Sequence, residues 1–329
     1  MQMKTQLGAF LISCLLSTVY SDGSVEYCYN LPKCNASTWS TIAPHECNGT
    51  NQSPINIVTA DVKPDSNLTA FSFRGFNDSS ALLNIENTGK AVKIVLDDQK
   101  MSVSGGGLGS QYNSTQFHFH WGNGSSVNGS EHTVDGRQYA MEMHIVNLRT
   151  DLNATAAANN SKGYAVLGFF IEATNESGKP ESWKNLTSFL ANITNGGDSL
   201  DIMNQLTVDS LIQGVNLTNY YRYQGSLTTP SCNEIVVWTV FKDPIKVSKD
   251  LISLFSNTVR INTTTDPLIT SNFRPVQALN NRVVTSQPTP STSASSSAGT
   301  LHHTLSISTA LLYYVLFRCL WSLSTMTLM

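Results

Sequence analysis

Charged residues are scarce in this sequence of 329 residues. Asp, Glu, Lys and Arg together make up only 13% of it, and the net charge is −3. A protein that binds nucleic acid or another strongly charged partner usually carries a run or patch of one sign, so the composition argues against such partners. Between its two ends the sequence also lacks internal repeats and linkers, which indicates one domain, expected over residues 24–282.

The first 21 residues have the features of a secretory signal peptide. One lysine is followed by the apolar run LGAFLISCLLSTV and then by small residues near Ser21. The run is too short to span a bilayer. It also lacks the amphipathic period of a buried core helix, which is the competing interpretation. Residues 1–21 are therefore expected to be removed during secretion.

The C-terminal end resembles a signal for attachment of a GPI anchor. Residues 283–300 are rich in Ser, Thr and Pro, and residues 301–329 form an apolar tail. Such a tail is removed when the anchor is attached, here between Ser291 and Gly299. The alternative is a transmembrane helix. Arg318 in the middle of the tail, and the lack of a basic segment after it, favour the anchor.

Cysteines are also few. Of the six, Cys14 and Cys319 lie in the two removable ends. The remaining four are Cys28, Cys34, Cys47 and Cys232. Four cysteines in a secreted domain indicate two disulfides, with three possible pairings. Asn-x-Ser/Thr sequences recur along the whole domain, which is typical of a glycosylated extracellular protein.

The middle of the chain predicts a mostly β (α+β) domain. Short β-favouring runs, separated by clusters of Gly, Asn, Asp and Ser, occupy residues 82–87, 91–96, 115–121, 139–148, 164–173, 220–227 and 234–241. Only residues 181–193 and 248–259 carry a helical pattern, and both segments are short. A sheet with a few peripheral helices is therefore expected.

Histidine is scarce too, with seven in the chain, yet two of them stand one residue apart in QFHFHWG. In a strand, His118 and His120 point to the same side, opposite Phe117 and Phe119. A third histidine, His144, lies in the strand-like run AMEMHIV. Three neutral imidazoles leave one position open on a tetrahedral zinc ion, as in catalytic sites. Most His-x-His pairs in strands bind nothing, so the neighbouring residues matter.

Those neighbours favour a metal. Zinc-bound histidines need an acceptor for their other ring nitrogen. Gln116 shares the face of His118 and His120, and Glu142 shares that of His144. Glu142 could instead be a surface carboxylate on a half-exposed strand, but it is flanked by two methionines, which fit that interpretation poorly.

Several separated motifs resemble those of the α-type carbonic anhydrases. QSPINI, QFHFHWG, SEHTVDG, MEMHIV, YAVLGFF, GSLTTP with VVWTVF, and NFRPVQ occur in that family's order and spacing over about 250 residues. The resemblance implies one domain on a large, twisted, mainly antiparallel sheet, with zinc at the floor of a conical cleft. The signal peptide, the anchor signal and the four cysteines look most like the GPI-anchored members at the extracellular face of the plasma membrane.

The resemblance also assigns roles around the zinc. His118, His120 and His144 match the metal ligands, and Gln116, Glu142 and the backbone of Asn272 match the acceptors that orient them. The implied reaction is reversible hydration of CO2 to bicarbonate and a proton, by attack of zinc-bound hydroxide. Sulfonamides and anions are the inhibitors that the resemblance implies.

Substrate-binding positions follow in the same way. Thr228, followed by Thr229, matches the residue that accepts a hydrogen bond from the hydroxide and donates one to Glu131. The apolar wall that holds CO2 matches Val146, Val166, Leu227 and Trp238. With this resemblance we expect Cys47 to pair with Cys232, and Cys28 with Cys34.

One position departs from the family pattern. Where the family usually has a histidine that passes the proton out, this chain has Lys90, in ENTGKAV. A free lysine is deprotonated only about one part in a thousand at neutral pH, so we expect a weak shuttle.

The alternative function is a non-catalytic, glycosylated adhesion or matrix module. The retention of the three histidines, Thr228 and Glu131 favours the enzyme.

Overall fold

The structure, a computed structural model, describes residues 26–288. The expected signal peptide, anchor-attachment site and apolar tail lie outside the described residues. Within residues 26–288, no helix combines the length and apolarity that a bilayer span requires.

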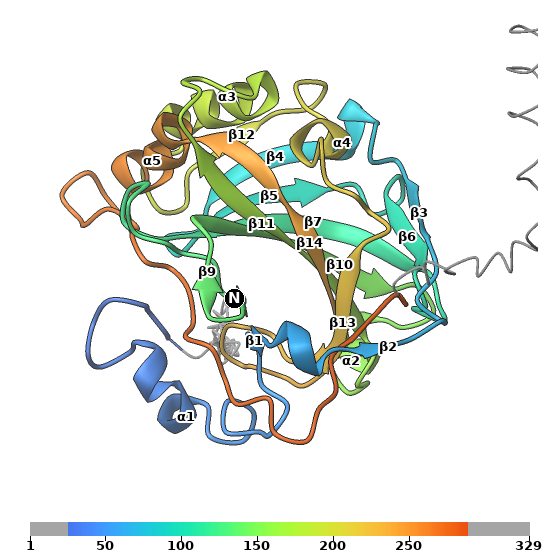
Figure 1. Cartoon of the computed structure of the whole chain (residues 1–329). Coiled ribbons are helices and arrows are strands. Elements are labelled where there is room, and N and C mark those ends of the chain that lie inside the picture. The colour runs from blue at the N-terminus through green and yellow to red at the C-terminus, as the bar shows by residue number, and fades with distance from the viewer. Residues whose placement is uncertain (1–25, 289–329) are drawn as a thin grey trace, which may run out of the picture. The chain divides into compact units, whose positions relative to one another are not determined.

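A twelve-stranded twisted sheet forms the body of the protein (Figure 1). Its strands follow the order β12-β4-β5-β7-β10-β11-β14-β13-β15-β2, with β3 paired to β6 and β6 to β7. Their bounds are β2 Lys63–Pro64, β3 Phe71–Arg74, β4 Leu82–Asn87, β5 Val92–Leu96, β6 Ser102–Gly105, β7 Tyr112–Trp121, β10 Met141–Arg149, β11 Tyr164–Thr174, β12 Ser199–Asp201, β13 Tyr220–Gly225, β14 Val236–Ser248 and β15 Thr285–Ser286. Only the pairs β11–β14 and β15–β2 in this sheet are parallel. The predicted large, mainly antiparallel sheet is confirmed.

Each of the seven predicted strand runs overlaps one strand, namely β4, β5, β7, β10, β11, β13 or β14, although their bounds differ from those of the strands, most of all at the end of β14. The two predicted helical segments form α3 (Glu181–Ser188) with the 3-10 turn η4 (Phe189–Asn192), and α5 (Lys249–Thr258). The remaining helices are short: η1 Ala36–Thr38, α1 Trp39–Ile42, η2 Thr59–Asp61, η3 Ser79–Ala81, α2 Ala154–Ala157 and α4 Val208–Leu211. Figure 1 shows α3, α4 and α5 together at one end of the sheet.

A small second sheet joins distant motifs. It contains β1 (Asn56–Ile57), β8 (Thr133–Val134) and β9 (Arg137–Gln138). The turn between β8 and β9 has positive φ at both Asp135 (49°) and Gly136 (78°), as a type I′ hairpin requires. Because β1 pairs with β8, QSPINI lies beside SEHTVDG.

The main core lies on the face of β7 opposite the histidines. Phe119 packs there against Trp183 of α3 and Phe255 of α5, with ring centroids 5.5 and 5.2 Å apart. Phe117 is buried in the same cluster. Burial of these large side chains therefore fixes which face of β7 presents His118 and His120.

The fold continues past residue 282, where the domain was expected to end. Thr285 and Ser286 form β15, which pairs with β13 on one side and β2 on the other. A two-residue strand has too little alternation to be recognised in a sequence, and the tertiary pairing determines it.

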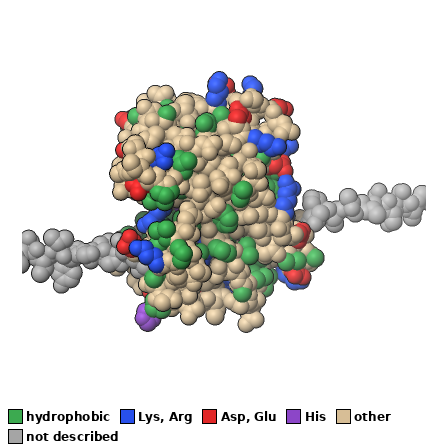
Figure 2. Space-filling model, turned by 90° about the vertical axis from the view of Figure 1, so that its left-hand side faces the viewer, with side chains coloured by type: hydrophobic (Ala, Val, Ile, Leu, Met, Phe, Trp, Pro, Cys, Tyr) green, Lys and Arg blue, Asp and Glu red, His purple; other side chains and the backbone are tan. Residues whose placement is uncertain are grey.

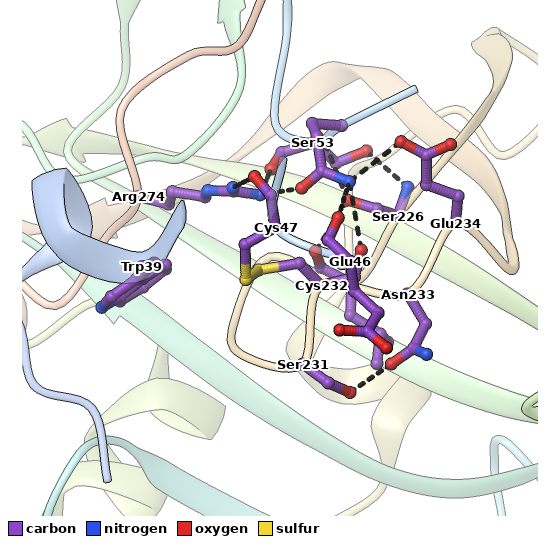
Figure 3. Close-up of a disulfide and its surroundings, with 12 residues drawn as sticks. Trp39, Glu46, Cys47, Ser53, Ser226, Ser231, Cys232, Asn233, Glu234 and Arg274 are labelled. Carbon is purple, nitrogen blue, oxygen red and sulfur yellow. Dashed lines mark hydrogen bonds between the residues drawn. A yellow bond between two sulfur atoms is a disulfide. The ribbon is translucent and has the colours of Figure 1, made fainter. Parts of the chain in front are cut away.

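Two disulfides hold the N-terminal segment. Cys47 is bonded to Cys232 and Cys28 to Cys34, the pairing expected from the resemblance. Figure 3 shows the first bond beside Trp39 and Arg274. Cys47, Cys232 and Trp39 are buried in one small cluster, so this disulfide joins the N-terminal segment to the loop that follows Thr228.

Replacing both Cys47 and Cys232 by serine should destabilise the protein more than the same change at Cys28 and Cys34. The first bond closes 185 residues and the second 6. In the chain-entropy description these loops correspond to about 5 and about 2 kcal/mol of stabilisation. Denaturant unfolding of the two double mutants measures the difference. Equal destabilisation would contradict this account, and peptide mapping of the parent protein checks the pairing itself.

Candidate metal centre

The register of two neighbouring strands brings the three histidines together. His144 on β10 lies directly opposite His118 on β7, and His120 lies opposite Glu142. The three imidazole centroids are 4.6 to 5.4 Å apart. One nitrogen from each ring lies within 4.8 Å of the other two, so together they could hold a metal ion.

The other nitrogen of each ring is held by an oxygen atom. His118 Nδ1 lies 2.9 Å from Oε1 of Gln116. His120 Nδ1 lies 2.8 Å from the backbone oxygen of Asn272, and His144 Nε2 lies 2.8 Å from Oε1 of Glu142. Each oxygen accepts, so each of these nitrogens donates. The lone pairs therefore remain on His118 Nε2, His120 Nε2 and His144 Nδ1, the three nitrogens that converge.

Burial favours the neutral form of His118 and His120. It is the main reason that the pKa of His118 is well below its usual value, with the nearby His120 and His144 adding to the effect. Burial also lowers the pKa of His120, partly opposed by the charge of Glu131. A metal binds only unprotonated imidazole, so these two rings are poised as ligands near neutral pH.

Glu142 is fully buried and accepts four hydrogen bonds. Its Oε1 accepts from His144 Nε2 and from His132 Nδ1 (2.8 and 2.7 Å), and its Oε2 from the backbone N–H groups of Glu131 and His132 (2.9 and 2.8 Å). Burial alone would raise the pKa of Glu142, but His132 and His144 outweigh it and hold that pKa well below its usual range. Glu142 is not a surface carboxylate.

Two buried atoms in this centre have no hydrogen-bond partner. They are Nε2 of His120 and Oε2 of Glu131. This oxygen lies 3.4 Å from His120 Nε2 and 3.8 Å from His144 Nδ1. Unsatisfied buried polar atoms are uncommon and point to a missing ligand or ion. Three convergent imidazole nitrogens are a donor set that suits zinc, so the residues fit this metal.

The second carboxylate oxygen of Glu131 has a partner that the sequence did not predict. This oxygen, Oε1, accepts a 2.8 Å hydrogen bond from the backbone N–H of Arg274. The expected hydrogen bond from Thr228 is not among those formed by the described residues. Instead, Oε2 of Glu131 is turned toward the ring nitrogens of His120 and His144.

An apolar wall lies across the three central strands. Val146 on β10 is opposite Val166 on β11, which is opposite Trp238 on β14. Leu227 packs on the same apolar cluster, and Thr228, the next residue, is buried. The Trp238 ring centroid lies 4.8 Å from that of His144. All four residues expected to hold CO2 therefore share one cluster next to a histidine.

Lys90 has a partner that the sequence did not suggest. It follows β4 in a turn and is half-buried, and its ammonium lies 4.2 Å from the ring centroid of Tyr27. Burial raises the pKa of Tyr27 to about 12, although a hydrogen bond with the side chain of Thr229 acts against this. Tyr27 thus contacts both the shuttle position and a predicted substrate-binding residue.

The other two histidines of the domain do not join the three. His132 is buried, and its Nε2 lies 2.6 Å from the hydroxyl of Tyr223, as befits a structural role. His45 is exposed and lines a surface hollow with Glu46 and Glu234, which none of the three clustered histidines lines.

Comparison with known proteins agrees with this arrangement. The sequence profile of eukaryotic-type carbonic anhydrases matches residues 34–288. Carbonic anhydrase 4 of Oryctolagus cuniculus is 37% identical over 265 residues, which cover 79% of this chain and 83% of the relative. Carbonic anhydrase 12 of Homo sapiens is 35% identical over 253 residues, 75% of this chain and 69% of that protein. Carbonic anhydrase 3 of Homo sapiens is 34% identical over 250 residues, 75% of this chain and 92% of that protein. The chain belongs to the eukaryotic-type carbonic anhydrase family.

Proposed function

We propose that this protein hydrates CO2 reversibly to bicarbonate and a proton, using zinc held by His118, His120 and His144, at the outer surface of the cell. One observation carries the proposal. Three imidazoles converge, and each has its second nitrogen fixed by a different oxygen acceptor. A closed structural site would need a fourth protein ligand, and the described residues that meet here supply three.

The residues around the centre suit an apolar substrate. A zinc ion held there supplies the Lewis acid that makes water acidic near neutral pH, with a pKa of about 7. The wall formed by Val146, Val166, Leu227 and Trp238 excludes water and accepts CO2, which has no dipole. Thr228 and Thr229 add hydroxyl groups next to this wall, and they are the groups we assign to orienting the reactants. Aromatic sulfonamides and small anions should compete at the same place.

Replacing any one of His118, His120 or His144 by alanine should abolish stoichiometric zinc binding and CO2 hydration. Each change removes one of three metal donors. Loss of His144 also removes one of the hydrogen bonds that the buried Glu142 accepts. Metal analysis and stopped-flow CO2 hydration measure the two properties. The exposed His45→Ala variant is the control and should keep both.

Two outcomes would contradict this proposal. Full activity in a ligand variant would remove the assignment of the metal centre. Stoichiometric zinc in the parent protein without sulfonamide-sensitive CO2 hydration would instead favour the non-catalytic adhesion or matrix module.

Proton release is the step that we propose to be weak. The usual shuttle position holds Lys90, whose ammonium rests against the Tyr27 ring. Contact with an aromatic face holds the ammonium in that position, and a charged ammonium has no lone pair to receive a proton. Among residues 26–288, His45 and His132 are the only histidines outside the metal centre. His132 is bonded to Tyr223 and Glu142, and His45 lines a surface hollow that none of the three clustered histidines lines.

Lys90→His should raise kcat about tenfold or more, because an imidazole titrates near neutral pH. The ratio kcat/KM, which reports the CO2 step, should change little. Stopped-flow measurements in dilute buffer give both constants, and added imidazole should raise kcat of the parent protein in the same way. Lys100→His, which places a histidine in the turn between β5 and β6, is the control. A high kcat that responds to neither change would show that another group carries the proton.

We also propose the outer cell surface as the location, reached by secretion and kept by a GPI anchor. Its support is the sequence of the two ends, together with two disulfides, which persist in oxidising compartments. The frequent glycosylation sequences agree with this route.

A phosphatidylinositol-specific phospholipase should release the protein from intact cells. The enzyme cuts the lipid from the anchor and leaves transmembrane helices untouched. Immunoblots of the medium and the membrane fraction measure release, with a known anchored protein as control. Retention of this protein while the control is freed would mean that the tail spans the membrane.

A further inference from the structure

Arg222 is a buried cation that forms no ion pair with the described residues. It lies on β13 with 8% of its surface exposed. Its Nε and Nη2 donate to Oγ1 of Thr239 (3.2 and 3.0 Å), and Nη2 also donates to the backbone oxygen of Gly106 (2.8 Å). Both acceptors are neutral. None of the ion pairs within residues 26–288 includes this guanidinium.

Aromatic rings compensate only part of that charge. The guanidinium carbon lies 5.5 Å from the Tyr220 ring centroid and 5.9 Å from that of Phe71. Such contacts are weak at this distance compared with an ion pair. The nearest carboxylate of the cavity, Asp65, acts on Arg222 only from a distance and forms no ion pair with it. A buried charge without a contacting counter-charge is unfavourable, and arginine cannot relieve the cost by losing its proton. An anion beside Arg222 would relieve it.

There is room for that anion. Arg222 lines a cavity of about 260 Å³ together with Lys162, Asp65, Gln224 and Thr285. A water molecule takes up about 30 Å³ in the liquid, so the cavity can hold a small oxyanion with several waters. Lys162 is exposed and forms no ion pair in the described part of the chain.

The cavity is separate from the metal centre. Arg222 lies beside Tyr220 and Phe71. Tyr223, whose hydroxyl shares a hydrogen bond with His132, also lines the cavity, so one tyrosine and one structural histidine stand between the cavity and His144. None of the three clustered histidines lines the cavity. A ligand there would not touch the zinc.

The charges of the cavity indicate which anion it suits. Arg222 and Lys162 contribute two positive charges and Asp65 one negative charge, which favours a single negative charge on the ligand. Asp65 already accepts from the backbone and side-chain N–H groups of Asn67 (2.9 and 3.0 Å), but a carboxylate has further lone pairs. Asp65 can therefore also accept a hydrogen bond from a hydroxyl group of the ligand.

We propose that this cavity is a second anion site, which binds a small oxyanion with one negative charge and one acidic hydroxyl. Bicarbonate and dihydrogen phosphate share this chemistry. The anionic oxygens accept hydrogen bonds from Arg222 and Lys162, and the hydroxyl donates to Asp65. The site does not depend on the metal centre being active, although bicarbonate is the product of the proposed reaction.

Isothermal titration of the zinc-loaded protein, expressed from the full-length sequence, tests the site. An aromatic sulfonamide is present in excess to occupy the metal centre. N-glycans are trimmed from every variant, because Asn67 at the rim begins a glycosylation sequence. Sodium bicarbonate and inorganic phosphate are titrated separately at constant ionic strength. Each should bind saturably, with a dissociation constant of roughly 1 mM. The anion that binds more strongly is the better candidate for the natural ligand.

Three variants assign the binding to named groups. Arg222→Gln should weaken binding about tenfold or more, and Lys162→Gln by about threefold. The exposed Arg137→Gln is the control and should bind like the parent protein. Asp65→Asn should improve the binding of sulfate relative to bicarbonate, since sulfate has no proton to donate at neutral pH and an amide can donate to it.

The proposal is overturned if the parent protein shows no saturable binding, or if Arg222→Gln binds as tightly as the parent. If Arg222→Gln does not fold, as shown by the lack of a cooperative unfolding transition, the variants of the exposed Lys162 and the half-buried Asp65 provide the test. Unchanged affinity in Lys162→Gln, together with an unchanged preference between sulfate and bicarbonate in Asp65→Asn, then places the anion elsewhere. Because the metal centre is blocked throughout, inactivity of the enzyme would not produce this result.

Discussion

The carboxylate of Glu142 is the interaction on which the metal centre depends. It accepts from His144, from His132, and from two consecutive backbone N–H groups at Glu131 and His132. A buried carboxylate is tolerated because all four donors compensate its loss of water. One side chain thereby orients a metal-facing ring, fixes the start of the segment that carries β8, and places Glu131 against the other histidines.

Arg274 ties the remaining loops to that centre. Its backbone N–H reaches Glu131, and its guanidinium donates to Gln52 Oε1 and to the backbone oxygens of Ser53 and Cys47. Figure 3 shows this guanidinium close to the Cys47–Cys232 disulfide. Since Cys232 follows Thr228 by four residues, the arginine and the disulfide act on the same loop. Arg274 thereby holds Glu131, and the disulfide holds the loop that carries Thr228.

The sequence predicted the parts of this structure in which apolar and polar residues alternate along a single strand. The central strands are long, and Phe117 and Phe119 separate cleanly from His118 and His120, so the face of β7 follows from the sequence. Short edge strands such as β2 and β15 carry no pattern of their own, and tertiary pairing alone determines them. The contact of Tyr27 with Lys90 joins residues far apart in the chain, and no local signal announces it. The hydrogen bond from Arg274 to Glu131 was not predicted for the same reason, because the two residues are 143 positions apart.

The apolar wall beside the three histidines and the pair formed by Lys90 and Tyr27 are held by different parts of the fold. Val146, Val166 and Trp238 lie in register across central strands of the sheet, where a change of volume disturbs close packing on both faces. Lys90 lies in a turn, and Tyr27 lies in a segment held by the small cluster around Trp39. The side chain at position 90 can therefore change without moving the three histidines. Close packing of the core therefore constrains the apolar wall, whereas the side chain at position 90 is constrained only by a turn and by the aromatic ring that it contacts.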